Sequence, residues 1–284
     1  MPRLKTREEI IITALAVPSL LGLLIFFIVP FGYSLYLAVI DNPVARNFVW
    51  FDNFIATFNN SAFKLAMRNT LTFMALSVPF NLVLPLLLAA VLKNFKHKEI
   101  LGMLFVLPLV VPSGAMVHFW HNLFGINGAV NGLFFRDSPI NWLGSDLSLV
   151  VILIIFMWKN AGFNIVLYQA GLNLIPSEYY EFAAVEGAGL FKKFRHITAI
   201  YLAPTFFMVM LMSVLATFRS FREIYLLSGA HPHSRIYMLQ HFMNNMFNSL
   251  NYQRLATAAY FLAAGIVIFA AGSMFLLRRV TRHE

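Results

Sequence analysis

Five long stretches of this chain contain no Asp, Glu, Lys or Arg, and this constrains the fold more than any other feature. They run from Ile10 to Ile40, Asn69 to Leu92, Ile100 to Phe135, Ile197 to Phe218 and Leu255 to Leu277. A sixth apolar stretch, from Leu147 to Ser177, is interrupted only by Lys159. A helix needs about 20 apolar residues to span a bilayer, because its backbone amides must be bonded within the segment. The sequence therefore predicts an all-α membrane protein with six transmembrane helices.

The composition agrees with this interpretation. Hydrophobic residues make up 60% of the chain and charged residues only 12%, which is too apolar for a soluble domain of this length. The first stretch is longer than the core of a cleavable secretory signal, so we expect it to remain as an anchor. The third stretch becomes rich in Gly and Asn from Asn122 onward, and this part is expected to lie outside the membrane core.

The distribution of basic residues predicts the orientation. If the N-terminus is cytoplasmic, 12 Lys and Arg lie on the inner side and 8 on the outer side. The inner ones are Arg3, Lys5, Arg7, Lys93, Lys96, Lys98, Lys192, Lys193, Arg195, Arg278, Arg279 and Arg282. Inner segments typically carry this excess. Both termini are therefore expected in the cytoplasm, and the net charge of +9 reflects topology and contact with lipid headgroups rather than binding to nucleic acid.

Several kinds of chemistry have no counterpart in the sequence. There is no Cys, no phosphate-binding loop with a Gly-Lys pair, and no HExxH or GxSxG motif. His118 and His121 are spaced for one helix face, but two His without a third ligand are more often interfacial polar residues than a metal site. We therefore expect no catalytic residues, no metal site and no bound cofactor in this chain.

Polar residues at membrane depth favour transport. Lys159 and Asn160 lie near the middle of the fourth span. Lys159 either faces the bundle interior or a watery path, or it belongs to a structural ion pair or is a snorkelling lysine. Ser213 and Thr217 share a helix face in the fifth span, where hydroxyls more often bond backbone or a neighbouring helix than a substrate. Proline also occurs within the spans. Each such proline leaves a backbone carbonyl without its helical hydrogen bond, and a neighbouring group must then donate to that carbonyl. These prolines are Pro30, Pro79, Pro85, Pro108, Pro112 and Pro204.

The cytoplasmic segment LIPSEYYEFAAVEGAGLFKKFRHI, within residues 173–196, predicts a short helix, a turn and a second helix. Pro176 suits a first helical position, and Glu178 and Glu181 suit the positive end of a helix dipole. Gly187 and Gly189 then interrupt the pattern. One side of the first helix has only small residues, and we call it the bare side; the helix also carries three aromatic residues. This composition favours a protein interface over an exposed connector. The bare side is formed by Ala183, Ala184, Gly187 and Ala188, and the aromatics are Tyr179, Tyr180 and Phe182.

This segment resembles the hallmark of the membrane subunits of binding-protein-dependent ABC importers, particularly the sugar-importing group typified by the maltose permease. The hallmark is E-A-A, three residues, Gly, nine residues and I-x-L-P. Here Glu181, Phe182 and Ala183 begin it, Gly187 follows six residues after Glu181, and Ile197 follows ten after that. The stretches MWKNAGFNIVLYQAGLNLIP, LFGINGAVNGLF and FREIYLLSGAHPHSRIY also occur in the expected order. Departures are Phe182 in place of the first alanine and Ala199–Ile200 in place of Leu-Pro.

The resemblance implies a type I ABC importer permease fold with a cytoplasmic coupling helix. Residues 1–68 would hold the N-terminal tail, first span and outer loop, and residues 69–284 the importer transmembrane domain. The coupling helix would contact a separate ATPase that binds ATP and Mg²⁺. Its contact residues would be Glu181, Phe182, Ala183, Ala184 and Gly187.

The resemblance also implies the remaining partners. They are a second permease subunit in a heterodimer, two cytoplasmic ATPase subunits and an extracellular or periplasmic binding protein, together in a bacterial cytoplasmic membrane. The sugar pathway would include Asn160, Phe163, Ser213 and Thr217. The alternative is a self-sufficient transporter driven by an ion gradient with Lys159 as its switch, and a membrane-embedded lipid enzyme is a third, weaker interpretation. The sequence shows no internal repeat of the kind that ion-gradient-driven transporters contain, and this argues against the alternative.

Overall fold

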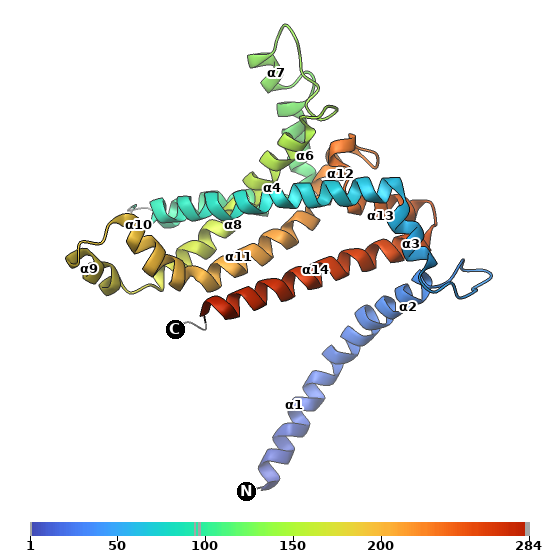
Figure 1. The fold of residues 1–284 in the computed structure, drawn as a ribbon, viewed down its shortest axis with the longest axis horizontal. Coiled ribbons are helices and arrows are strands. Elements are labelled where there is room, and N and C mark those ends of the chain that lie inside the picture. The colour runs from blue at the N-terminus through green and yellow to red at the C-terminus, as the bar shows by residue number, and fades with distance from the viewer. Residues whose placement is uncertain (1, 94, 96–97, 282–284) are drawn as a thin grey trace. The chain divides into compact units, whose positions relative to one another are not determined.

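The computed structural model describes residues 2–93, 95 and 98–281, and all named elements in these ranges are helical. In chain order the helices are α1 (Pro2–Leu23), η1 (Leu24–Ile28), α2 (Val29–Ala38), α3 (Asp52–Asn59), α4 (Ser61–Leu92), α5 (Lys98–Val110), α6 (Ser113–Phe124), α7 (Ala129–Phe134), α8 (Ser148–Asn173), α9 (Ser177–Val185), α10 (Leu190–Lys193), η2 (Phe194–Thr198), α11 (Ala199–Arg219), α12 (Phe221–Ser228), η3 (Ser234–Ile236), α13 (Leu239–Asn248) and α14 (Tyr252–Thr281) (Figure 1). Lys96 and Arg282, used above for orientation, lie outside the described residues.

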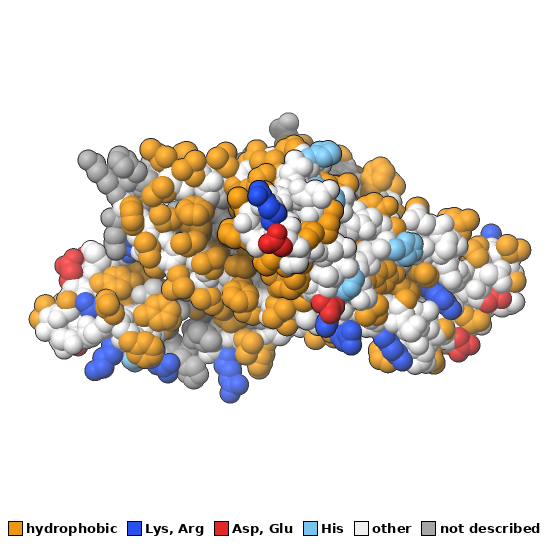
Figure 2. All heavy atoms as spheres, turned by 90° about the horizontal axis from the view of Figure 1, so that it is seen from above, with side chains coloured by type: hydrophobic (Ala, Val, Ile, Leu, Met, Phe, Trp, Pro, Cys, Tyr) orange, Lys and Arg blue, Asp and Glu red, His pale blue; other side chains and the backbone are white. Residues whose placement is uncertain are grey.

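Long apolar helices account for the predicted spans. Within the described ranges, five helical segments are long and apolar enough to cross a membrane, and the number is six if one bent pair of helices is counted as a single span. The five are Ile11–Ala38, Ser61–Leu92, Ser148–Asn173, Leu190–Ser228 and Tyr252–Arg279. Figure 2 shows apolar side chains over much of the face that it presents, as expected for a surface that lies against lipid. The all-α membrane fold predicted from the sequence is confirmed.

The third span is bent instead of straight. The segment Ile100–Val110 meets Ser113–Phe134 at 96°. Proline explains the position of the break, because Pro112 cannot donate the next helical hydrogen bond and stands as the N-cap of α6 with an extended ψ of 137°. The chain therefore leaves the direction of α5 at Pro112, before the Gly- and Asn-rich part that begins at Asn122.

The described chain packs as two compact units. One consists of Met1–Phe63 with Met243–Ala263, and the other of Lys64–Phe242 with Ala264–Glu284. The larger unit holds two buried apolar clusters, one around Trp120 and Phe156 and one around Tyr168 and Leu202. The boundary after residue 68, which the family resemblance implies, stays a prediction.

Within the larger unit, α5 and α8 approach each other backbone to backbone at Gly162. A Cβ atom added there would lie within 2.2 Å of both the carbonyl carbon and the carbonyl oxygen of Phe105. Membrane helices approach this closely only where a residue has no side chain, since packing rather than the hydrophobic effect holds them together. Gly162 therefore fixes the position of α8, the helix that leads to α9.

We expect Gly162→Ala to destabilise the chain by about 2 kcal/mol, because the clash is with backbone that cannot rotate away. Thermal unfolding of the purified chain in detergent measures the effect. Gly272→Ala is the matched control, since a Cβ there meets nothing within 4 Å. Equal melting temperatures for the two variants would contradict the close approach of α5 and α8.

Candidate functional site

The segment from α9 to α10 forms a helix, a tight turn and a helix, as the sequence predicts. Pro176 stands at the N-cap of α9, one residue before the position predicted for it. The helix ends with two hydrogen bonds, from Gly187 N to Ala184 O at 3.0 Å and from Ala188 N to Ala183 O at 2.8 Å. This is a Schellman motif, which needs a left-handed residue at the turn. Gly187 provides it with a φ of +72°.

Apolar side chains project from both sides of this turn. Phe182 is 74% exposed, Val185 and Leu190 are each 89% exposed, and Phe191 is 75% exposed. These four side chains, with the exposed carboxylates of Glu178, Glu181 and Glu186, are called the α9–α10 surface below. Large exposed apolar patches rimmed by charge mark interaction sites. Figure 1 shows α9 and α10 at the end where α8 and α11 meet.

The two tyrosines of α9 hold this segment on the spans. The Tyr180 hydroxyl lies 2.9 Å from the Thr198 hydroxyl, and the Lys93 ammonium lies 5.4 Å from the centre of the Tyr180 ring. The Tyr179 ring lies 5.3 Å from that of Tyr201. Of the three aromatics that the sequence singled out, Phe182 alone belongs to the α9–α10 surface. The sequence-based interpretation missed Val185, Leu190 and Phe191. Apolar residues on both sides of a turn glycine could have indicated that these side chains are exposed.

Lys159 lies in an ion pair with Glu223 of α12. The Ser113 hydroxyl donates to the same Glu223 oxygen at 2.9 Å, and the Lys159 ammonium donates to Ser113 Oγ at 3.2 Å. The Lys159 and Glu223 side chains are 20% and 10% exposed. These three residues, called the Lys159 cluster below, join α8, α12 and the first residue of α6. Of the interpretations that the sequence left open for Lys159, the ion pair is the one that the structure supports.

A second polar cluster joins three spans. The Asn164 amide of α8 donates to Asn81 O at 3.1 Å and to Ser213 Oγ at 3.2 Å, and the Asn81 amide of α4 donates to Ser213 Oγ of α11 at 3.1 Å. All three residues are at least 98% buried. They are called the Asn164 cluster below, and neither Asn81 nor Asn164 was among the candidate residues.

The predicted pathway residues have different surroundings. Asn160 is half-buried and its amide donates to Phe156 O at 2.8 Å, whereas Phe163 is 39% exposed. Ser213 belongs to the Asn164 cluster, and the buried Thr217 hydroxyl donates to Val214 O at 2.6 Å. Ser213 is therefore the predicted pathway residue that the structure brings together with polar side chains of other spans.

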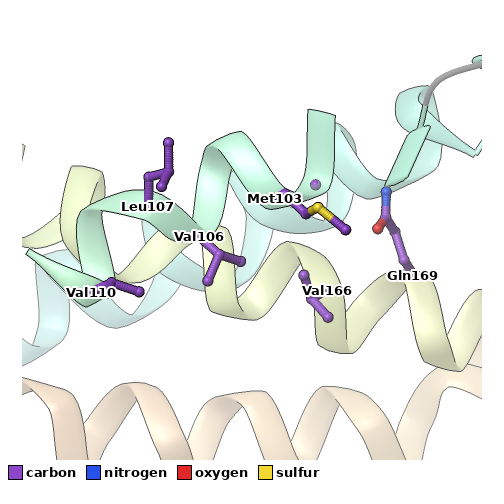
Figure 3. Close-up of a pocket in the computed structure, with 7 residues that line it drawn as sticks. Met103, Val106, Leu107, Val110, Val166 and Gln169 are labelled. Carbon is purple, nitrogen blue, oxygen red and sulfur yellow. The ribbon is translucent and has the colours of Figure 1, made fainter. Parts of the chain in front are cut away.

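An apolar groove opens between α5 and α8 (Figure 3). It has a volume of about 370 Å³ and is lined by Gly102, Met103, Val106, Leu107, Val110, Val166 and Gln169. Gln169 contributes the one polar side chain of this lining. Sugar sites combine apolar faces with several convergent hydrogen-bond partners, so the groove does not fit a sugar.

His241 on α13 is buried and neutral. Burial, and to a smaller extent the charge of His231, lower the pKa of His241 to about 4. Its Nδ1 accepts a hydrogen bond from Met238 N at 3.2 Å. Among the residues that the structure describes, no group of three or more His, Cys, Asp or Glu side chains lies close enough to hold a metal ion. The His241 ring packs against that of Phe221, with the ring centres 4.8 Å apart.

Comparison with known proteins gives a consistent result. The family described as "Binding-protein-dependent transport system inner membrane component" matches residues 69–283. A probable ABC transporter permease protein of Bacillus subtilis, YesP, is 32% identical over 74% of this chain and 71% of its own. The trehalose/maltose transport system permease protein MalF of Thermococcus litoralis is 30% identical over 81% of each chain.

The fold is shared with a solved structure. A chain of the bacterial alginate ABC transporter, crystallised in complex with an alginate pentasaccharide-bound periplasmic protein, covers 98% of this chain and 97% of its own. The TM-score is 0.83 and the sequence identity is 20%. At this identity the likeness establishes the architecture of the spans.

Proposed function

Because the chain belongs to the family of binding-protein-dependent transport system inner membrane components, we propose that it is the permease subunit of an ATP-driven ABC importer for a sugar. It lies in the cytoplasmic membrane as a multi-pass subunit and passes a mono- or oligosaccharide from an external binding protein to the cytoplasm. The family consists of transport components, so this chain is not an enzyme. The relatives named above for trehalose, maltose and alginate support a carbohydrate substrate.

The α9–α10 surface is the observation that carries the proposal. It is an exposed apolar patch with three carboxylates on a helix whose turn is fixed by Gly187. We propose that it seats in a cleft of a cytoplasmic ATPase, with Glu181 meeting a basic residue of that partner. The apolar side chains of Phe182 and Val185 would supply most of the buried contact area.

The remaining subunits follow from this assembly. A second permease subunit forms a heterodimer with this chain, two ATPase subunits bind ATP and Mg²⁺, and an external binding protein delivers the sugar. Both termini and the α9–α10 surface face the cytoplasm, as the distribution of basic residues indicates. This division of labour agrees with the absence of a phosphate-binding loop from the sequence.

We propose Asn160, Phe163, Ser213 and Thr217 as residues of the sugar pathway. Asn160 and Phe163 are accessible on α8 and offer an amide and an aromatic face, the groups that bind sugar hydroxyls and sugar rings. Ser213 and Thr217 are buried and bonded within the chain. They would therefore meet the sugar only after the spans separate.

Gentle purification of the tagged chain from native membranes tests this proposal. We expect it to bring down a second permease and an ATPase with a phosphate-binding loop, and the purified assembly to hydrolyse Mg-ATP. A thermal-shift screen of the external binding protein against mono- and oligosaccharides then identifies the sugar. A lone homogeneous chain that transports in liposomes on an ion gradient would contradict the proposal.

A further inference from the structure

Helix α4 contains a break in its backbone hydrogen bonding at a position where another span supplies the donor. Proline at position 85 has no N–H, so the carbonyl of Asn81, four residues earlier, loses its normal helical partner. The Asn164 amide of α8 donates to this carbonyl at 3.1 Å. An unpaired carbonyl at membrane depth is costly. Asn164 therefore satisfies in trans the group that Pro85 leaves free.

The Asn164 cluster is only partly satisfied. Within the described chain, Asn81 Oδ1 and the hydroxyl of Ser77, one turn earlier on α4, are buried without a hydrogen-bond partner. Three membrane spans thus meet through amide and hydroxyl groups that hold more bonding capacity than they use. The spare acceptors would let this cluster exchange partners, whereas a close-packed apolar interface has no such groups.

The chain connects this cluster directly to the α9–α10 surface. Helix α8 runs into α9, and α10 continues through η2 into α11. Asn164 and Ser213 are therefore carried by the two spans that flank the segment proposed to contact the ATPase. Asn164 lies nine residues before the end of α8, or about 14 Å along a helix. A displacement of α9 would move both side chains relative to α4.

We propose that the break in the hydrogen bonding of α4 at Pro85, bridged by Asn164, is a pivot at which α4 bends during the transport cycle. Asn164 acts as a positioning residue in this pivot: it holds the freed Asn81 carbonyl and the Ser213 hydroxyl together in one state and releases them in the other. Helices bend most readily where proline interrupts the hydrogen-bond ladder. The inference rests on the proposed function, because it assumes that ATP hydrolysis in a partner drives the motion.

A double-mutant cycle between positions 85 and 164 tests the bridge. Asn164→Leu removes the donor at similar volume, and we expect the melting temperature of the purified chain to fall by several degrees. Pro85→Ala restores an N–H that can bond the Asn81 carbonyl within α4. The pair should therefore be non-additive, with Pro85→Ala recovering part of the loss. Pro79→Ala is the matched control, because Pro79 frees a different carbonyl and should not rescue Asn164→Leu. Equal rescue by both would overturn the bridge.

Turnover of the assembled transporter in lipid nanodiscs, with Mg-ATP as the added ligand, tests the pivot. We expect Pro85→Ala, alone and with Asn164→Leu, to lower ATP hydrolysis about tenfold, a barrier about 1.4 kcal/mol higher. The melting temperature of Pro85→Ala alone should stay near that of the wild type. Wild-type turnover in a stable Pro85→Ala assembly would overturn the pivot. Failure of the wild-type chain to assemble with any ATPase would instead count against the proposed function. If Asn164→Leu does not fold, the Pro85→Ala variant still decides the question.

Discussion

Glu181→Arg together with Gly187→Leu should abolish ATP-dependent uptake while leaving the chain in the membrane. The first change reverses a charge on the α9–α10 surface. The second places a side chain at a φ of +72°, where a residue with a Cβ costs about 1–2 kcal/mol and the Schellman turn would open. Both positions are exposed, and a Cβ at Gly187 meets nothing within 4 Å. The fold of the spans should therefore survive.

Uptake of labelled sugar by cells, normalised to the amount of the chain in the membrane, measures this effect. The matched control makes the same chemical changes on the first helix, as Glu9→Arg with Gly22→Leu, where Glu9 is exposed and a Cβ at Gly22 meets nothing within 4 Å. The control should transport normally. Uptake at the normal rate in the α9 variant would disprove the coupling role of this surface.

Glu223→Leu should strongly destabilise the folded chain. The change leaves the Lys159 ammonium without its counter-ion in the interior of a membrane protein, on a side chain that is 20% exposed. Removing one partner of a buried ion pair costs about 3–5 kcal/mol, because the other charge stays desolvated. It also leaves the Ser113 hydroxyl without its acceptor at the start of α6. We expect a lower yield from membranes and a clearly lower melting temperature in detergent.

Two further variants make this prediction specific to the ion pair. The exchange Lys159→Glu with Glu223→Lys restores opposite charges and should recover most of the stability. Asp146→Leu removes the acid of the Arg235–Asp146 pair, whose side chains are 54% and 75% exposed, and surface pairs contribute little. If Glu223→Leu and Asp146→Leu melt at the same temperature, the Lys159 cluster contributes no more to the stability of the fold than an exposed surface pair.

Much of the α9–α10 segment could be predicted from the sequence because its signals are local. The glycine at position 187 and the alanines before it lie within one helical turn, and the structure has the helix, the turn and the second helix where the pattern indicated. The outward orientation of Leu190 and Phe191 was harder to predict from the sequence. It depends on Tyr179 and Tyr180 packing against residues of η2 and α11, which fixes the opposite side of the segment.

The partner of Lys159 shows where reading the sequence reaches its limit. A lysine within a span needs an acid, and Glu223 is the one acid between Glu186 and Glu284. Glu223 could therefore have been identified from the sequence as the partner of Lys159. It was not, because the sequence places it after the fifth span, in a segment that the predicted topology assigns to an outer loop. The structure places it on α12, a separate short helix directly after α11. The 96° bend at Pro112 brings Ser113 to the same point.

The sequence by itself determined the approximate ends of the long apolar helices and the position of the α9 turn. These depend on lengths and compositions within about 20 neighbouring residues. Only the tertiary structure decided that Asn164 bridges the proline break of α4, or that Lys159 pairs with a residue 64 positions away. Such pairs depend on which helices pack together and at what rotation. A periodic apolar pattern leaves both open, because lipid and a neighbouring helix are equally apolar surroundings.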